Sequence, residues 1–390
     1  MNWSPWTWPF LEPRHTDLAL RLQDWQRQHR ATDESAGHSA YLGVETRRFA
    51  RDLAAWGFLD YAVPIDAKSV DVRSLALIRE ALAYCSPLAD SAFAMQGLAT
   101  APIWLVGSDD LKERYIAPCR HGERIAAIAV TEPEAGSDVG AITTIAHVSN
   151  NGYLINGEKI WITNAGVADH YIVIARTGKE PGARGLSALI VDAGTPGLEV
   201  GPHAEMIAPH PIAGLKFRDC WVPASNLIGR PGEGFKAVMA TFDIFRTTVG
   251  AAALGMARRA FDEALERVRT RRIFGKPMSE LESVQTKLAD MHLDVQSAGL
   301  LVYSAAWARD VRDSRVSREV ALAKLGATEA AQRVIDAAVQ LFGGLGVSRR
   351  CIVEQLYRDI RPLRIYEGAS EIQKLIVARS LLAEANSSLT

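Results

Sequence analysis

The chain has 390 residues, enough for two or three domains with a large core. Hydrophobic residues make up 48% of it and charged residues 23%, as in an ordinary soluble globular protein. Its 44 Lys and Arg nearly balance 45 Asp and Glu, and this net charge of -1 argues against bulk attraction to nucleic acid or to an anionic membrane.

The cysteines and histidines form no metal-binding pattern. The four cysteines are far apart and lack a CxxC pair, and the nine histidines are dispersed without an HExxH pair. We therefore predict no metal site, and free, buried thiols in a reducing compartment. The four are Cys85, Cys119, Cys220 and Cys351.

The N-terminal stretch carries no targeting pattern that we recognise. It contains Glu12 and Asp17, which a transit peptide would usually avoid. No stretch reads as long and apolar enough to span a bilayer. We expect a cytoplasmic protein without membrane insertion.

The first third of the chain is predicted to be helical. Apolar residues recur at three- and four-residue spacing over 17–30, 43–55 and 74–84. Pro87, Pro102 and Pro118 are expected to mark breaks between helices. We assign residues 1–124 to an N-terminal α-helical domain.

Short β-prone runs follow, rich in Ile, Val, Thr and Tyr. The turns Asn150-Asn151-Gly152 and Asn156-Gly157 are expected to separate strands. Strands at this spacing without helices between them predict a small antiparallel β domain at 125–231. The runs are 126–131, 143–147, 152–155, 171–175 and 186–191.

Long helical patterns fill the last part of the chain, from Gly232 onwards. They cover 235–270, 280–312 and 315–340, and Gly343-Gly344 interrupts them. Helices longer than usual predict a bundle with near-antiparallel packing at 232–390. The fold class is therefore α+β.

Glu367 is the first candidate for chemistry. It lies in an apolar surround of Ile365, Tyr366 and Ile372, and Gly368 lets a ligand approach the backbone. Burial raises the pKa of a carboxyl group, which suits a general base. The alternative is a glutamate at a tight turn that begins a helix.

Two segments of the β domain can meet a planar ligand. The loop at 129–138 has small residues, hydroxyls and a glycine, although a plain exit from a strand is the alternative. In the segment 156–165, Trp161 and Thr163 would point to the same face of a strand and could cover a flat ring. Core packing of Trp161 is the alternative.

Two further segments suit a nucleotide. Arg271 can donate two hydrogen bonds to a pyrophosphate and Phe274 can stack on an adenine, although a cationic helix end is the alternative. Gly343 and Gly344 let the backbone approach a bulky ligand, or else cap a helix. The chain has neither GxGxxG after a strand nor GxxxxGK[ST], so a nucleotide cofactor needs another fold.

In order and spacing from about 97 to 382, these segments together resemble the acyl-CoA dehydrogenase family. Phe242-Asp243, Arg246, Arg271 and Phe274 look most like the medium-chain and short-chain members. The resemblance implies an N-terminal α-helical domain, a middle antiparallel β domain and a C-terminal four-helix bundle. It is also what identifies FAD as cofactor and an acyl-CoA thioester as substrate.

The resemblance implies roles for individual residues. The implied catalytic base is Glu367. The implied cofactor contacts are Ile128, Val130, Thr131, Gly136, Ser137, Trp161, Thr163, Arg271, Phe274, Gln340, Gly343, Gly344, Ala369 and Glu371. The implied substrate contacts are Ser137, Phe242, Asp243, Arg246, Tyr366 and Gly368. Part of each FAD site would come from a neighbouring subunit, which implies a homo-oligomer, usually a dimer of dimers.

The implied reaction gives a trans-2-enoyl-CoA. Glu367 takes the pro-R α-proton while the β-hydrogen leaves as hydride to flavin N5, and its own backbone N–H with a ribityl hydroxyl holds the thioester oxygen. The electrons then pass to an electron-transfer flavoprotein.

Some positions depart from the family pattern and leave the FAD contacts and the acyl group open: Glu282, Arg350, Gln355 and Ala369. Same-fold oxidases, desulfinases and monooxygenases are alternatives, as is a non-catalytic dehydrogenase-like binding protein. Glu367 and Arg246 are both present, which favours dehydrogenation.

Overall fold

The computed structural model of the protein describes residues 8–29, 39–65, 70–312, 316–349 and 351–387. The chain divides into two compact units. Unit 1 contains Met1–Ala36, Asp71–Asp90 and Arg246–Thr390, and unit 2 contains Gly37–Val70 and Ser91–Phe245. Helices and a large sheet confirm the α+β class. The three-domain division at 124 and 231 stays a prediction.

Unit 1 is built from helices, among them those predicted near 17–30, 74–84, 280–312 and 315–340. Asp71 caps the second of these helices by accepting a hydrogen bond from Ser74 N. The helices of this unit are α1 (Pro13–Gln28), α4 (Val72–Cys85), α8 (Glu282–Val311), α9 (Ser317–Phe342), α10 (Ile352–Ile360), α11 (Ser370–Ser387) and most of α7 (Gly234–Thr270).

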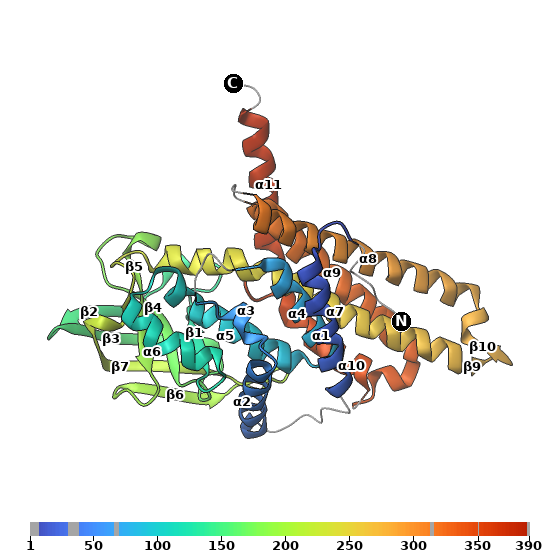
Figure 1. The fold of residues 1–390 in the computed structure, drawn as a ribbon, viewed down its shortest axis with the longest axis horizontal. Helices are drawn as coiled ribbons and strands as arrows, with labels where there is room; N and C mark the ends of the chain where they lie inside the picture. The colour runs from blue at the N-terminus through green and yellow to red at the C-terminus, as the bar shows by residue number, and fades with distance from the viewer. Residues whose placement is uncertain (1–7, 30–38, 66–69, 313–315, 350, 388–390) are drawn as a thin grey trace. The chain divides into compact units, whose positions relative to one another are not determined.

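Small residues let the long helices of unit 1 pack closely. A Cβ on Gly250 of α7 would lie 3.0 Å from Val302 of α8 and 3.3 Å from Ala327 of α9. The three helices therefore run side by side (Figure 1), and the C-terminal half of α11 extends away from them. This arrangement agrees with the expected bundle.

Helix α7 corrects one prediction. By length and composition it could cross a membrane, since an 18-residue window in it has a mean hydropathy of 1.3. The sequence prediction that no stretch is this long and apolar is therefore wrong. However, 72% of that window is buried inside the protein, which is typical of a core helix.

Unit 2 holds an eight-stranded sheet in the order β6-β7-β3-β2-β4-β5-β8, with β1 paired to β4. Most pairs are antiparallel, but β1 runs parallel to β4, as does β2 at one residue pair. The sheet is thus mixed rather than antiparallel throughout. The strands are β1 (Ala126–Ala129), β2 (Ile145–Ser149), β3 (Gly152–Thr163), β4 (His170–Arg176), β5 (Leu186–Asp192), β6 (Leu198–His203), β7 (Ile212–Pro223) and β8 (Leu227–Ile228).

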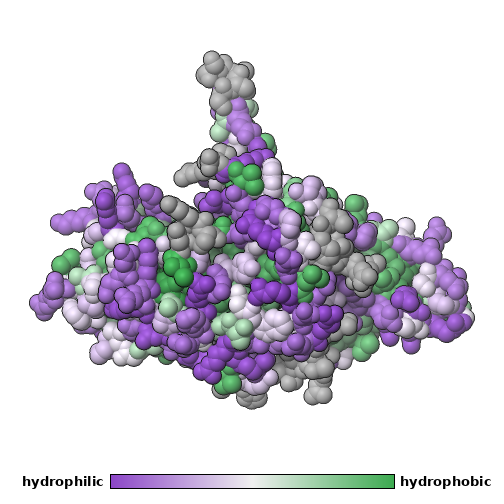
Figure 2. All heavy atoms as spheres, in the orientation of Figure 1, coloured by the Kyte–Doolittle hydropathy of each residue, from purple (hydrophilic) through white to green (hydrophobic). Residues whose placement is uncertain are grey.

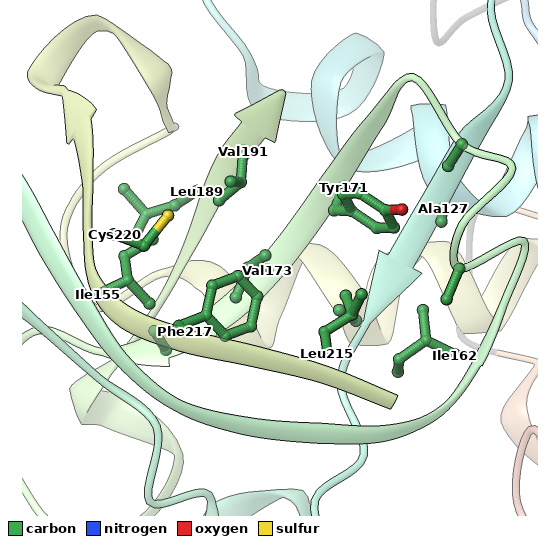
Figure 3. Close-up of a cluster of buried hydrophobic side chains, with 14 of the residues drawn as sticks. Ala127, Ile155, Ile162, Tyr171, Val173, Leu189, Val191, Leu215, Phe217 and Cys220 are labelled. Carbon is green, nitrogen blue, oxygen red and sulfur yellow. The ribbon is translucent and has the colours of Figure 1, made fainter. Parts of the chain in front are cut away.

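The core of unit 2 lies against this sheet. Figure 3 shows side chains from β1, β3, β4, β5 and β7 pointing into one cluster, with Tyr171, Val173 and Phe217 near its middle. Ala50 joins it from α2 (Ser39–Ala55). The other helices of this unit are α3 (Leu59–Ala62), α6 (Asp109–Arg120) and most of α5 (Pro87–Val106).

The two predicted turns have different outcomes. Asn150 and Asn151 adopt φ of 46° and 60° between β2 and β3, which confirms that turn. Asn156 and Gly157 lie inside β3 instead, where the register shifts relative to β7. This second prediction was wrong, because a bulge uses the same residue types as a turn.

The predicted proline breaks also need correction. Pro87 begins α5, as expected, but Pro102 lies inside α5 and Pro118 inside α6. Tertiary packing outweighs the lost hydrogen bond, since α5 is buried along most of its length.

All four cysteines are free and buried, as predicted. The face shown in Figure 2 is mainly hydrophilic with small hydrophobic patches.

Candidate active site

Glu367 lies in a strained turn of unit 1 between a short 3-10 helix (Arg361–Arg364) and α11. Its φ is +52°, and Gly368 follows with φ of +94°. A left-handed conformation costs a residue with a Cβ about 1–3 kcal/mol, so surrounding contacts must hold this turn.

Lys324 of α9 holds the turn through two backbone carbonyls. Its Nζ donates to Tyr366 O at 3.0 Å and to Gly368 O at 2.7 Å. The lysine is fully buried. Burial lowers the pKa of Lys324 to about 8, although the nearby Glu367 carboxyl raises it.

Two more side chains donate to the same turn. Arg246 Nε on α7 donates to Glu367 O at 3.1 Å, and Gln373 Nε2 on α11 donates to Gly368 O at 2.8 Å. The φ of +94° at Gly368 strains any residue with a Cβ, and such a Cβ would also lie 2.5 Å from Gln373 Nε2, which would have to shift, so this position favours glycine. Three helices thus fix one turn.

Glu329, also on α9, binds both flanks of the turn. Arg364 Nε and Ser370 Oγ donate to its Oε1 at 2.9 and 2.7 Å. The 3-10 helix and the start of α11 are therefore joined through one carboxylate.

The carboxyl group of Glu367 keeps one oxygen available to accept a proton. Its Oε2 atom is buried and has no hydrogen-bond partner among the described residues. Burial raises the pKa of Glu367, while the charges of Arg79, Lys324 and Arg246 oppose that rise. The predicted raised pKa is thus confirmed in direction, with burial as its main cause.

A buried ion pair acts electrostatically on this carboxyl group. Arg79 of α4 binds Asp90 through Nε and a terminal nitrogen, both at 2.8 Å, and its other terminal nitrogen donates to Thr248 Oγ1 at 3.1 Å. Asp90 offsets the arginine charge, so Arg79 only partly opposes the raised pKa of Glu367. The sequence analysis missed Arg79 and Lys324, although a cation inside an apolar helical run is a usable signal.

In unit 2, a second buried ion pair fixes the predicted ring-binding loop. Lys159 Nζ lies 2.8 Å from Glu132 Oε1 and donates to Val130 O at 2.9 Å. The Glu132 carboxylate also accepts hydrogen bonds from Thr143 N at 2.7 Å and Thr144 N at 2.9 Å. Burial by itself raises the pKa of Glu132, but Lys159 and these donors lower it to about 2.

Trp161 is exposed, not buried. It lies at a bulge in β3, where the register shifts between Lys159 and Ile162, and its φ is +56°. The side chain is 57% exposed, so the alternative of core packing is wrong. Because of the bulge, the two-residue alternation used to align Trp161 with Thr163 does not apply there.

The remaining loop residues lie near the end of β1. Ile128 and Thr131 are half-buried, and Val130 is buried. Gly136 and Ser137 are exposed, and apart from its chain neighbours no described residue lies within 4 Å of a Cβ built on Gly136. The loop therefore presents small groups to open space.

The segments predicted to bind adenosine lie at one end of the unit 1 helices. Arg271 is exposed just after α7, and Phe274 is 91% exposed in the turn of a small hairpin, β9 (Arg272–Ile273) and β10 (Lys276–Pro277). Arg267 stacks over Phe342, 5.6 Å from its ring centre, which joins the end of α7 to the end of α9. At that end, Gly343 caps α9 with a φ of +62°.

The other predicted site residues differ in location and exposure. Gln340 and Gly344 are exposed next to Gly343. Phe242, Asp243 and Arg246 share one side of α7 and are half-buried. Tyr366, Gly368, Ala369 and Glu371 lie in or beside the Glu367 turn.

Among the departures from the family pattern, Glu282 is exposed at the start of α8, Gln355 is half-buried in α10, and Arg350 lies outside the described residues.

Comparison with known proteins identifies the family. Residues 127–220 match the model of the acyl-CoA dehydrogenase middle domain, and residues 232–382 match that of the C-terminal domain. Over 377 residues the chain is 34% identical to the mitochondrial short-chain specific acyl-CoA dehydrogenase of Sus scrofa, covering 96% of this chain and 87% of that protein.

A second relative has a different activity in its name. The 3-(aryl)acrylate reductase of Clostridium sporogenes is 35% identical over 341 residues, which cover 86% of this chain and 90% of that protein.

A solved structure agrees with these relatives. The butyryl-CoA dehydrogenase from Megasphaera elsdenii superposes with a TM-score of 0.85 at 32% identity, covering 95% of this chain and 99% of that one. The chain therefore belongs to the acyl-CoA dehydrogenase family, whose members are flavoprotein oxidoreductases.

Proposed function

We propose that this protein is an FAD-dependent dehydrogenase that converts an acyl-CoA thioester to the trans-2-enoyl-CoA and passes the electrons to an electron-transfer flavoprotein. One observation carries the proposal: the Glu367 carboxyl group has a raised pKa and a buried oxygen with no hydrogen-bond partner in the described part of the chain, in a strained turn held by Lys324 and Arg246. A buried carboxyl with an unused acceptor is what a general base requires.

The residues predicted to hold FAD fit such a group. Trp161 presents an exposed aromatic face at a bulge, and Arg271 presents an exposed guanidinium. Apart from the neighbours in the chain, no heavy atom of the described residues lies within 4 Å of a Cβ built on Gly343 or Gly344, so a bulky ligand can approach there. When bound, FAD supplies the acceptor for the β-hydrogen of the substrate.

Glu367 removes the α-proton in this scheme. The electrons of the broken α C–H bond form the new C=C bond, and the β-hydrogen leaves with its electron pair. The raised pKa makes Glu367 a stronger base than an exposed carboxylate. Lys324 and Arg246 keep its backbone fixed and favour its ionised form.

Flavin absorbance provides the test. Purified protein should be yellow, and an acyl-CoA should bleach it in the absence of oxygen. Glu367→Gln should bind substrate but reduce the flavin at least ~100-fold more slowly, since general-base catalysis contributes about this much or more. Glu113→Gln, at an exposed site of unit 2, is the control. Wild-type reduction rates in Glu367→Gln would refute the assignment.

A second candidate is a flavoenzyme of the same fold with a different reaction. The relative named 3-(aryl)acrylate reductase favours testing it. A panel with butyryl-CoA, branched and aromatic acyl-CoA esters, and free aryl acrylates separates the two. Bleaching by a CoA ester supports dehydrogenation, whereas reoxidation of chemically reduced protein by an aryl acrylate supports the reductase.

We also propose a homo-oligomer, with a dimer of dimers as the expected form, and a cytoplasmic location. Large apolar side chains are exposed on helices of unit 1, and a subunit interface would cover them. They include Leu293 and Leu300 on α8, Leu322 on α9, and Leu375 and Leu382 on α11. The molar mass in solution tests the assembly.

A further inference from the structure

Lys324 is a buried cation whose ammonium group contacts the turn that carries Glu367, the proposed base. It lies on α9 within an apolar run, where Ala321, Ala323 and Ala327 are all buried. The lysine itself has no exposed surface. An ammonium group in such a place is costly unless its donors are used, so its contacts need an explanation.

Within the described residues, the ammonium group donates its two hydrogen bonds to the turn that carries Glu367. Nζ donates to Tyr366 O at 3.0 Å and to Gly368 O at 2.7 Å, the two carbonyls on either side of Glu367. If Lys324 only filled space, an apolar residue could replace it. Instead, its ammonium group joins the two carbonyls that flank Glu367, the residue proposed as the base.

The turn depends on such support. Glu367 and Gly368 both have positive φ, and this conformation strains the backbone of Glu367 because that residue carries a Cβ. Buried carbonyls require donors. Gln373 also donates a hydrogen bond to Gly368 O. The distinctive contribution of Lys324 is therefore its hydrogen bond to Tyr366 O, together with its positive charge beside the carboxyl group.

We propose that Lys324 is a positioning residue for proton abstraction: its ammonium group binds the carbonyls of Tyr366 and Gly368, which orients the Glu367 carboxyl, and its charge favours the ionised form of that carboxyl. The inference rests on the proposed function, in which Glu367 is the base.

The charges around Lys324 predict how this role depends on pH. Glu367 from the turn, Glu329 on α9 and Glu371 on α11 raise its pKa, and Arg246 on α7 lowers it. Burial is the largest influence and brings the pKa of Lys324 to about 8. Above this pH the amine becomes neutral, loses the charge that steadies the carboxylate and donates more weakly. Flavin reduction should therefore decline on the alkaline side.

Lys324→Met tests the inference, with Lys374→Met as its control because Lys374 is exposed on α11. Misplacement of a catalytic group by about 1 Å can cost ~100-fold in rate, so we expect a ~100-fold slower limiting rate of flavin reduction with a much smaller change in apparent substrate affinity. Removing the charge also raises the pKa of Glu367, so the acidic limb of the rate profile should move to higher pH.

Lys324→Arg provides the second variant, because arginine keeps its charge at every pH used. It should regain part of the lost rate and lose the alkaline decline near pH 8. If Lys324→Met does not fold, as judged by flavin content and thermal unfolding, Lys324→Arg and the wild-type profile decide the matter. A wild-type profile without an alkaline decline, or a decline that persists in Lys324→Arg, overturns the inference.

The outcomes separate this inference from the proposed function. If Lys324→Met reduces flavin at the wild-type rate with unmoved limbs while Glu367→Gln is slow, Lys324 has no positioning role and the dehydrogenase assignment stands. If Glu367→Gln is as fast as wild type, the proposed function itself fails.

Discussion

The buried pair of Glu132 and Lys159 gives a sharp test of how unit 2 holds the loop that was predicted to bind the ring. Glu132→Gln removes the charge that balances Lys159, which has no exposed surface and otherwise donates to Val130 O. Breaking a buried ion pair by removing one partner typically costs about 3–5 kcal/mol.

The pKa of Glu132 leads to a similar magnitude. Folding lowers it from 4.5 to about 2, and a difference of this size corresponds to roughly 3 kcal/mol. Because the folded-state pKa is the lower one, this stability is present above about pH 4.5 and is lost as the pH falls towards 2. The difference between variant and wild type should therefore shrink in acid.

Thermal unfolding measures the effect. A loss of about 3–5 kcal/mol corresponds to a fall in Tm of roughly 10 °C for the unit concerned. Glu134→Gln, two residues away and exposed, is the control and should leave Tm unchanged. The double variant Glu132→Gln with Lys159→Met should lose less than the sum of the single losses, since it leaves no unpaired charge. A Glu132→Gln variant within about 2 °C of wild type at neutral pH would show that the pair does not hold this loop.

Two further predictions concern the cofactor and the turn. Arg271→Ala should lower the fraction of FAD retained after gel filtration, because an exposed guanidinium suits a pyrophosphate; unchanged flavin content rejects that role. Gly368→Ala should slow flavin reduction and cost about 1–3 kcal/mol, since φ is +94° and the new Cβ would lie 2.5 Å from Gln373 Nε2. Gly178→Ala is its control, with 3.7 Å to the nearest atom, and equal melting temperatures for the two variants would contradict the reasoning.

Local patterns in the sequence were enough to predict many elements. The apolar spacing that predicted α4, α8 and α9 is a property of neighbouring residues on one helix. Asn150 and Asn151 predicted their turn because asparagine tolerates positive φ. The segment around Glu367 was recognisable for a similar reason, since its apolar neighbours and glycine are adjacent in the chain.

Only the tertiary structure decided how Glu367 is held. Lys324 lies 43 residues before Glu367, and Arg246 lies 121 residues before it, so no local pattern connects them. The same holds for the pairs of Arg79 with Asp90 and Glu132 with Lys159, which form across separate elements.

Strand pairing and exposure were also beyond the sequence. The parallel pairing of β1 with β4 depends on which strands meet, not on the residues of either. Trp161 became exposed because a bulge reset the alternation of β3, and Asn156-Gly157 formed a bulge because β7 continued beside it. Chain neighbours thus determined the elements and the identity of the candidate base, whereas its pKa, its strain and its supporting charges arose when distant segments excluded water together.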